Sequence, residues 1–564
     1  MHRAGVVRLI VLLAVAVART VPSGAEDARG ADSGREEFRH GRYAEAERLF
    51  AAAVRDGEGR SLPAAEQAAR IDNLAAVRKK LGRYEEAGTL WRHALGLREG
   101  AGGQAGVEAA AELDGLADVA ALQGRYDEAE SLAARSISIK EGALGPEHPS
   151  LADSLAVLGA VARIRGRDEE AEWLYRRAVG LVETSAPAAH VNLRVGLAQA
   201  LRSQGRTAEA EDVCRRALDL GEQALPPDHP DLAPILDALA LVRRDQGRLD
   251  DAAALIGRAQ AIQEQALGPD HPLLIPVLSH AADLELRRGR AATALPLYRR
   301  ALALAERTLG ADHTEVSVAL NNVAVALATG GRRAEAEPLY RRSLAVAERA
   351  LGSQAASLSP TLDNLGALLL AEGRYGEAMT VLQRSIAITE GSKGQDDPRL
   401  ATPVSRLAAV QTAVGRLDDA APLYERALSL VEHASGPAHC RLVPLLNRLA
   451  EVQNARGDRS ASEDLYRRAV AVADTAADCD PSERMMALNN LAFLYRERGE
   501  RDEAKHLFVR ALAALEATAG PGDPAMVTIL RNLAVLCEET GDRSYAKALS
   551  RRARAIEASV SPTR

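Results

Sequence analysis

Histidine is the residue type whose spacing first suggests chemistry in this sequence. Six of the twelve histidines recur in one register, 24 residues after a glycine: His148, His190, His229, His271, His313 and His439. Imidazole nitrogens bind metals and titrate near neutral pH, so the series resembles a metal site or a pH-sensing ladder. Two histidines on one zinc ion must each lie about 2.1 Å from it, whereas packed helices stand roughly 10 Å apart. We therefore interpret the series as a repeated linker residue and predict no metal site.

Motifs for catalysis or cofactor binding are weak or missing in the sequence. Gly100, Gly102 and Ala105 fit a loose dinucleotide-binding motif. That motif needs a preceding strand, and a helical pattern precedes it here. The sequence contains no phosphate-binding loop, no H-E-x-x-H, no G-x-S-x-G and no C-x-x-C. We predict that the protein is not an enzyme and binds no cofactor.

The four cysteines are of two kinds. Cys214 and Cys537 occupy apolar positions of helical patterns, so we expect both to be small buried residues. Cys440 and Cys479 lie between helical patterns, 25 and 22 residues after successive glycines. A disulfide between them would fit an oxidising compartment, but it requires Cα atoms within about 7 Å of each other. Their pairing is a hypothesis that the fold must decide.

The elements that position these residues form a repeat of 42 residues. Thirteen glycines recur from Gly41 to Gly541, at intervals of 41, 42, 42, 39 and then eight times 42 residues. Small residues, mostly alanine, stand five and twelve residues after each glycine, and a large residue often stands nine residues after it. Eleven residues before the glycine stands Leu, Ile or Val in eleven of twelve repeats. Each set of offsets shares one helical face, so the unit is two helices joined by a tight glycine turn.

The repeat resembles a known family. The matching residues are the pair Leu491-Ala492, the turn Gly373-Arg374-Tyr375, the helical series Ala336, Tyr340 and Ser343, and the linker from Leu267 to Pro272. They resemble the tetratricopeptide repeat over about residues 30–560, in the 42-residue form of kinesin light chains and many bacterial proteins. The resemblance implies an all-α, right-handed solenoid of about twelve helix-turn-helix repeats plus a leading half-repeat. It also implies a non-catalytic scaffold that binds protein or peptide segments in its concave groove.

Polar residues of the first helix of each repeat are the candidate binding residues. In the N-terminal half, aspartates such as Asp114, Asp118 and Asp237 are expected to face the groove. In the C-terminal half the candidates are Asn321, Asn322, Asp363, Asn364, Arg406, Asn447, Arg448, Asn489, Asn490, Arg531 and Asn532. Asparagine is a poor helix former, yet its amide can both donate to and accept from a peptide backbone. The resemblance implies that role, and the alternative is a solvated face without a ligand.

The arginines of this series suggest the chemistry of the partner. Arginine can hold a carboxylate through two parallel hydrogen bonds. We therefore predict a protein or peptide partner with an acidic segment or a free C-terminus. The formal charge of −7, from 71 basic and 78 acidic residues, argues against a general nucleic-acid binder.

The N-terminal segment predicts export. Residues 1–25 have the layout of a secretory signal peptide: Arg3 and Arg8, an apolar run over residues 9–18, and small residues at 23–25. The run is too short to span a membrane, which takes about 20 residues, and no later stretch is long and apolar enough. We expect a periplasmic or secreted protein whose residues 26–564 form the solenoid. The alternative is a regulatory subunit or adaptor for a separate enzyme, held at the membrane by uncleaved residues 9–18.

Overall fold

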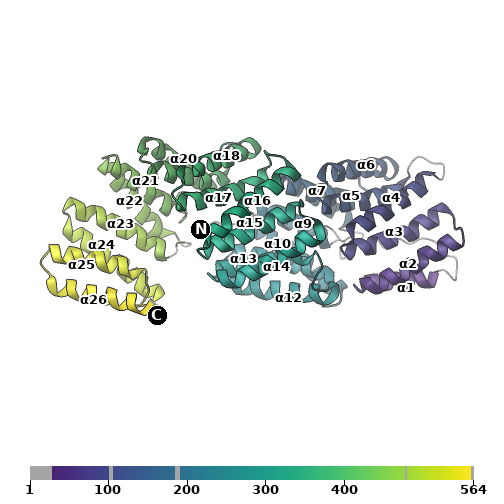
Figure 1. Ribbon diagram of the computed structural model, residues 1–564, viewed down its shortest axis with the longest axis horizontal. Coiled ribbons are helices and arrows are strands. Elements are labelled where there is room, and N and C mark those ends of the chain that lie inside the picture. The colour runs from purple at the N-terminus through teal and green to yellow at the C-terminus, as the bar shows by residue number, and fades with distance from the viewer. Residues whose placement is uncertain (1–27, 101–105, 184–190, 477–478, 480, 561–564) are drawn as a thin grey trace. The chain divides into compact units, whose positions relative to one another are not determined.

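The computed structural model describes residues 28–100, 106–183, 191–476, 479 and 481–560. Within these ranges the chain forms 26 α-helices and three short 3-10 helices and contains no β-strand (Figure 1). The prediction of an all-α solenoid of helix pairs is confirmed. The signal segment 1–25, Gly102, Ala105 and His190 lie outside the described residues.

The helices alternate between two positions in each pair. The first helices are α1 (Ala28–Arg39), α3 (Ala64–Lys80), α5 (Val107–Leu122), α7 (Leu151–Ile164), α9 (Val191–Ser203), α11 (Ala233–Asp245), α13 (Leu274–Arg287), α15 (Thr314–Thr329), α17 (Ser359–Ala371), α19 (Ala401–Ala413), α21 (Leu442–Ala455), α23 (Pro481–Arg498) and α25 (Met526–Glu539). The second helices are α2 (Tyr43–Gly59), α4 (Tyr84–Gly100), α6 (Tyr126–Leu144), α8 (Asp168–Val182), α10 (Thr207–Ala224), α12 (Leu249–Leu267), α14 (Ala291–Leu309), α16 (Arg333–Leu351), α18 (Tyr375–Lys393), α20 (Leu417–Ser435), α22 (Arg459–Thr475), α24 (Arg501–Ala519) and α26 (Arg543–Val560). The 3-10 helices η1 (Pro230–Leu232), η2 (Ala356–Leu358) and η3 (Pro398–Leu400) precede α11, α17 and α19.

The leading unit is a complete helix pair among the described residues, where the sequence suggested half a repeat. Its first helix, α1, lacks the leucine stripe of the other repeats. A Cβ atom added to Gly34 of α1 would lie 2.8 Å from the ring of Phe50. This glycine keeps the small-residue position of the repeat, so α1 packs on α2 through a small residue and an aromatic ring although it lacks the leucine stripe.

The glycine turns end the first helix of each pair. Gly331 has a φ of 80°, a left-handed conformation that side chains with a Cβ disfavour. The following N–H of Arg332 donates to the carbonyl of Leu327 at 2.8 Å, which is the bond of a Schellman C-cap. Beyond the turn, the small residue at offset five, Ala336, is fully buried beside the buried Tyr340. The predicted crossing of small and large residues is therefore the packing core of the pair.

The described chain divides into two compact units, with the boundary between Thr361 and Leu362 inside α17. We call residues up to 361 the N-terminal unit and residues from 362 the C-terminal unit. In both, successive first helices contact one another, as α9 contacts α11 and α21 contacts α23. The first helices therefore line the concave, inner side of each unit.

The N-terminal unit closes on itself after about four and a half repeats. Nε2 of His229, His271 and His313 lies 3.0, 2.8 and 2.9 Å from the carbonyl oxygens of Arg39, Lys80 and Leu122, respectively. In each case Nδ1 accepts a backbone N–H two residues further along, at 3.1–3.2 Å. Nε2 must therefore carry the proton and donate it to the carbonyl. We call these three contacts the interturn seam.

Other contacts along the seam leave little space between the two turns. Lys80 Nζ donates to Asp231 at 2.7 Å, and the hydroxyl groups of Tyr126 and Thr314 lie 2.8 Å apart. A Cβ atom on Gly82 would lie 2.6 Å from the ring of Pro272. The turn glycines of the first repeats therefore also serve close packing of the turns.

Candidate peptide-binding surface

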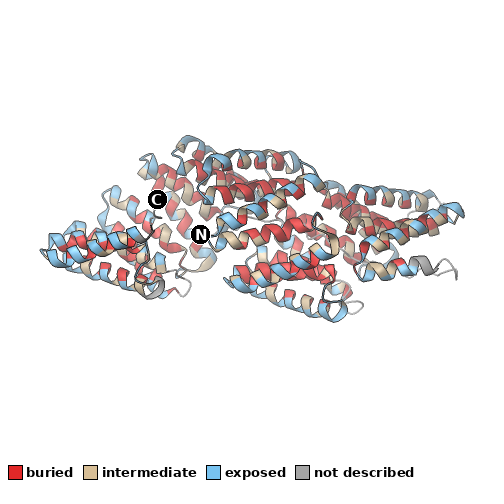
Figure 2. Cartoon of the chain, turned by 60° about the horizontal axis from the view of Figure 1, so that its bottom comes forward, coloured by how far each residue is buried: buried red, intermediate tan, exposed pale blue. Residues whose placement is uncertain are grey.

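The inner helices of the two units differ in how far they are buried. In the N-terminal unit, 12 of 14 residues of α7, 11 of 13 of α9 and 11 of 13 of α11 are buried. Figure 2 colours the described residues by burial, with buried residues in red. In the C-terminal unit only 7 of 13 residues of α19 and 7 of 14 of both α21 and α25 are buried. The inner helices α19, α21 and α25 of the C-terminal unit are therefore less buried than α7, α9 and α11 of the N-terminal unit.

The aspartates of the N-terminal unit form ion pairs and do not face an open groove. Asp118 accepts from Lys79 at 2.6 Å, and Asp114 accepts from the fully buried Lys140. Asp237 lies 2.7 Å from the buried imidazole of His280. Asp114, Asp118 and Asp237 were expected to face the groove, but each of these three carboxylates instead meets a basic group of its own unit.

The first predicted binding residues lie at the end of the N-terminal unit and around α17. Asn321 and Asn322 on α15 are buried, and Asn321 donates to the Asn322 amide oxygen at 3.3 Å. Asp363 and Asn364 on α17 are half-buried. The Asp363 carboxylate accepts from Ser385 Oγ at 2.6 Å, and burial raises its pKa to about 6.

The three predicted arginines have different surroundings. Arg406 on α19 is half-buried and donates to the backbone carbonyl of Asp363 at 2.8 Å. Arg448 on α21 and Arg531 on α25 are exposed, with 64% and 63% of their side chains accessible. They pair with Glu451 and Glu557 at 2.9 and 2.6 Å. Exposed pairs of this kind are worth at most about 1 kcal/mol.

The predicted asparagines of α21, α23 and α25 offer unused hydrogen-bonding groups. Asn447 is buried, and neither atom of its amide has a partner among the described residues. Asn532 donates to Asn489 Oδ1 at 2.9 Å, and Asn489 donates to Asn490 Oδ1 at 3.4 Å. This chain of amides crosses from α25 to α23. It uses one donor of Asn532 and the acceptor of Asn490.

Three exposed apolar residues on the same helices were missed from the sequence. Met486 and Phe493 on α23 and Val535 on α25 are 41–42% exposed. Phe493 and Val535 stand six residues before the turn glycine, where the three preceding repeats have Ala or Glu. This substitution was a visible signal. We call Met486, Phe493 and Val535, together with Asn489, Asn490 and Asn532, the inner patch.

A cationic group lies beside the inner patch. The guanidinium of Arg496 lies 5.6 Å from the centre of the Phe493 ring, and it pairs with Glu539 of α25 at 3.3 Å. Large apolar side chains exposed beside unused amides are typical of protein interaction sites.

Comparison with known proteins identifies the repeat. The sequence model of a family described as tetratricopeptide repeat matches residues 107–184, 189–265, 235–307, 274–348, 315–391, 399–475 and 483–557. No curated protein matches the chain. Among the described helices, none has both the length and the apolar character needed to cross a membrane.

Several solved structures are similar to the chain. One is the APC/C hetero-tetramer Cut9-Hcn1, with 14% identity over 94% of this chain and 94% of that chain and a TM-score of 0.48. A second is BtubC (BKLC) from P. vanneervenii, with 23% identity over 44% and 93% and a TM-score of 0.34. A third is a putative kinesin light chain from Podosopora anserina with nearly identical TPR-like repeats, with 23% identity over 36% and 97% and a TM-score of 0.29.

Proposed function

Because the chain belongs to the tetratricopeptide repeat family, whose members are typically scaffolds that bind proteins, we propose that it holds an extended segment of a partner protein on the inner face of its C-terminal unit. The observation that carries this proposal is the accessible inner stripe of α19, α21, α23 and α25, in contrast to the buried helices α7, α9 and α11 of the N-terminal unit.

The inner patch supplies the groups that an extended peptide needs. Asn490 can donate to a backbone carbonyl and Asn532 can accept from a backbone N–H. Phe493, Met486 and Val535 can cover an apolar side chain of the peptide, and burying one such side chain is worth about 1.5–3 kcal/mol. The inner patch therefore binds one apolar residue of the partner peptide and the peptide backbone on either side of it.

Arg448 and Arg531 favour an acidic segment or a free C-terminus. Both guanidinium groups are exposed on the inner helices, and each can form charge-assisted bonds to a carboxylate. Arg406 contributes to this surface indirectly, because its hydrogen bond to the Asp363 carbonyl holds α19 to α17.

A peptide selection tests this function. A random peptide library displayed on phage is selected on the full-length chain, and the affinity of the best peptides is then measured by fluorescence anisotropy. We expect acidic peptides with one large apolar residue. Phe493→Ser should weaken them at least ten-fold, and Arg448→Glu with Arg531→Glu should do the same, since each lost charged contact costs about 1.5–3 kcal/mol.

The matched control is the double reversal Arg125→Glu and Arg167→Glu. These arginines lie in turns of the N-terminal unit and pair with Glu128 and Glu130, so their reversal should leave binding intact. Equal affinities for the inner-patch variants and this control would rule out the inner face of the C-terminal unit as the binding surface.

We propose in addition that the protein is exported. The signal-like residues 1–25 and a disulfide between Cys440 and Cys479 both support an oxidising compartment outside the cytosol. Mass spectrometry of the protein from its native host should find a new N-terminus near residue 26. An intact N-terminus in the cytosolic fraction would refute export, and an intact N-terminus in the membrane fraction would favour the anchored adaptor.

A further inference from the structure

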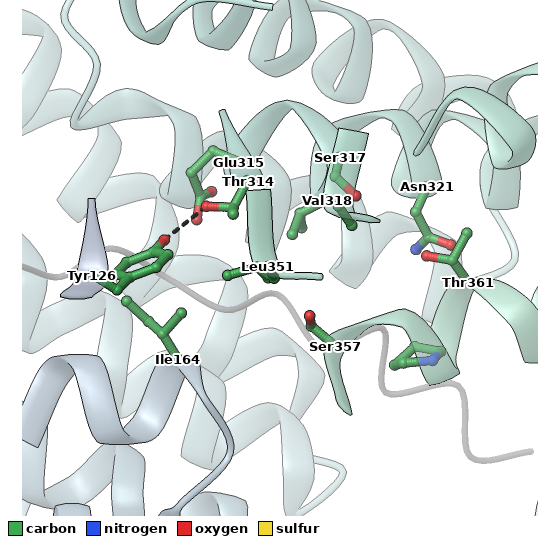
Figure 3. A pocket seen from close by; sticks show the side chains of 12 residues that line it. Tyr126, Ile164, Thr314, Glu315, Ser317, Val318, Asn321, Leu351, Ser357 and Thr361 are labelled. Atoms are coloured by element: carbon green, nitrogen blue, oxygen red, sulfur yellow. Dashed lines mark hydrogen bonds between the residues drawn. The ribbon is translucent and has the colours of Figure 1, made fainter. Parts of the chain in front are cut away.

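A cavity of about 40 Å³ lies where the interturn seam ends. The seam pairs residues 39, 80 and 122 with histidines 229, 271 and 313. One repeat further, Ile164 corresponds to Leu122 and Ala355 corresponds to His313. The methyl group of Ala355 therefore takes the place of the imidazole in this repeat. Ile164 lines the cavity on one side and Ser357 lines it on another (Figure 3).

The cavity has apolar walls and unpartnered polar groups. Ile164, Val318 and Leu351 form part of the walls. The side chain of Glu315 is only 6% exposed, and its carboxyl group has no hydrogen-bond or ion-pair partner among the described residues. Ser357 Oγ is buried and also unpartnered. Asn321 and Thr361 line the end of the cavity away from Glu315 (Figure 3). A buried carboxyl and a buried hydroxyl without partners are costly unless a ligand satisfies them.

The same unit shows which group satisfies such oxygens. The ammonium of Lys140 is buried and donates to the carboxylate of Asp114, to Ser154 Oγ at 3.1 Å and to the Ser150 carbonyl at 2.7 Å. Lys80 is buried against Asp231 in the same way. The chain contains only six lysines. In both Lys80 and Lys140 the buried ammonium group pairs with a carboxylate. The cavity offers a carboxyl and a hydroxyl of the same kinds, without a lysine of the chain.

We propose that this cavity binds the side chain of a lysine from a partner protein. The ammonium group would lie at Glu315, and the aliphatic stem would lie against Val318 and Leu351. Glu315, Val318 and Asn321 are three residues apart on one side of α15, which spreads them over about 9 Å. That length suits a lysine side chain whose backbone is held by the Asn321 amide. This site lies within the N-terminal unit and does not depend on the proposed function of the inner patch.

Ionisation of Glu315 gives the binding a pH dependence. Burial raises the pKa of Glu315 to about 8, although the Arg163 guanidinium lowers it in part. The other titratable groups around it are His313, two residues away, and the phenols of Tyr84 and Tyr126, which line the cavities on its two sides. An ammonium ligand favours the ionised carboxylate, so the proton must leave on binding. Affinity should therefore rise about fifty-fold between pH 6 and pH 8.

The experiment uses the full-length chain and two probes, N-acetyl-lysine N-methylamide and n-butylammonium chloride. Ligand-observed NMR titrations at constant ionic strength give both affinities between pH 6 and pH 8. We expect the lysine derivative to bind more tightly, with the pH dependence above. Asn321→Ala should weaken the lysine derivative alone, whereas Glu315→Gln should weaken both probes at least ten-fold.

Two further variants keep the test decisive. Glu335→Gln removes an exposed carboxylate of α16 that pairs with Arg332, and it should change nothing. Val318→Phe fills the cavity without removing a charge and should abolish binding of both probes even if Glu315→Gln does not fold. Binding that is independent of pH, or that survives in Val318→Phe, would overturn the proposal. Equal affinity for the two probes in the native chain would assign the site to a free amine and not to a protein lysine.

Discussion

Replacing a seam histidine should cost the protein much less stability at pH 4 than at pH 7. Burial lowers the pKa of both His271 and His313 to about 4, from an ordinary value near 6.5. Since the folded pKa is lowered, the unfolded chain binds more protons between these values. The stabilisation by each histidine is thus complete above about pH 6.5 and is lost as the pH falls towards 4. The stabilisation of the folded state by each histidine should fall by about 3 kcal/mol over this range.

The physical reason is the pair of hydrogen bonds that each neutral imidazole makes. Nδ1 of His313 accepts the N–H of Glu315 and Nε2 donates to the Leu122 carbonyl. A second proton on Nδ1 removes the acceptor and places a charge in a buried contact between two turns.

The pH profile of the native protein alone does not isolate this effect. Burial raises the pKa of Glu112 to about 7 and that of Glu315 to about 8, so these carboxyls stabilise the folded state on acidification and oppose the histidines. The informative quantity is the difference in free energy of unfolding between native protein and His313→Ala, measured by urea denaturation. We expect this difference to shrink by about 3 kcal/mol from pH 7 to pH 4.

Thr314→Val is the matched control for this prediction. It removes the seam hydrogen bond to Tyr126 without removing a titrating group, so its cost should stay constant with pH. A difference for His313→Ala that also stays constant would mean that the imidazole does not bridge the two turns in solution.

The helix pairs could be predicted from the sequence because their signal is local and repeated. Offsets such as that of Ala336 and Tyr340 lie within one helix, and the turn at Gly331 needs only neighbouring residues. The seam could not be predicted, since it joins residues about 190 positions apart whose meeting depends on small rotations summed over several repeats. The histidine register was visible in the sequence, but its acceptor carbonyls were not.

The sequence predicted the helix of each candidate inner-face residue, but it did not predict the contacts that these residues make with neighbouring helices. The register placed Asn490, Arg448 and Asn532 on inner helices, where the structure has them. It did not reveal that Asp118 and Asp237 are buried in pairs, because their partners come from neighbouring helices. After His313 the register holds Ala355 and Asp397 before histidine returns at His439, so the histidine series alone does not mark where the seam stops.

Loss of the disulfide between Cys440 and Cys479 should destabilise the C-terminal unit strongly. The two Cα atoms lie 5.0 Å apart, and the bridge joins residues separated by 39 positions. Cross-linking a loop of this length removes conformational freedom from the unfolded chain and is worth about 4 kcal/mol. The double variant Cys440→Ser and Cys479→Ser should lower the free energy of unfolding of this unit by about 4 kcal/mol, measured by urea denaturation. Reductant should shift the native protein in the same direction.

The position of the bridge links this prediction to the proposed binding surface. Cys440 precedes α21 and Cys479 precedes α23, the helices that carry Arg448 and Asn490. Without the bridge these two inner helices lose a covalent tie near their starts, so the selected peptides should also bind less tightly. Cys537→Ala, which removes a buried free thiol of α25, is the control that should leave the response to reductant intact. If reductant moves the double variant as far as the native protein, or peptide mapping of the exported protein finds both thiols free, the bridge does not hold the two helices together.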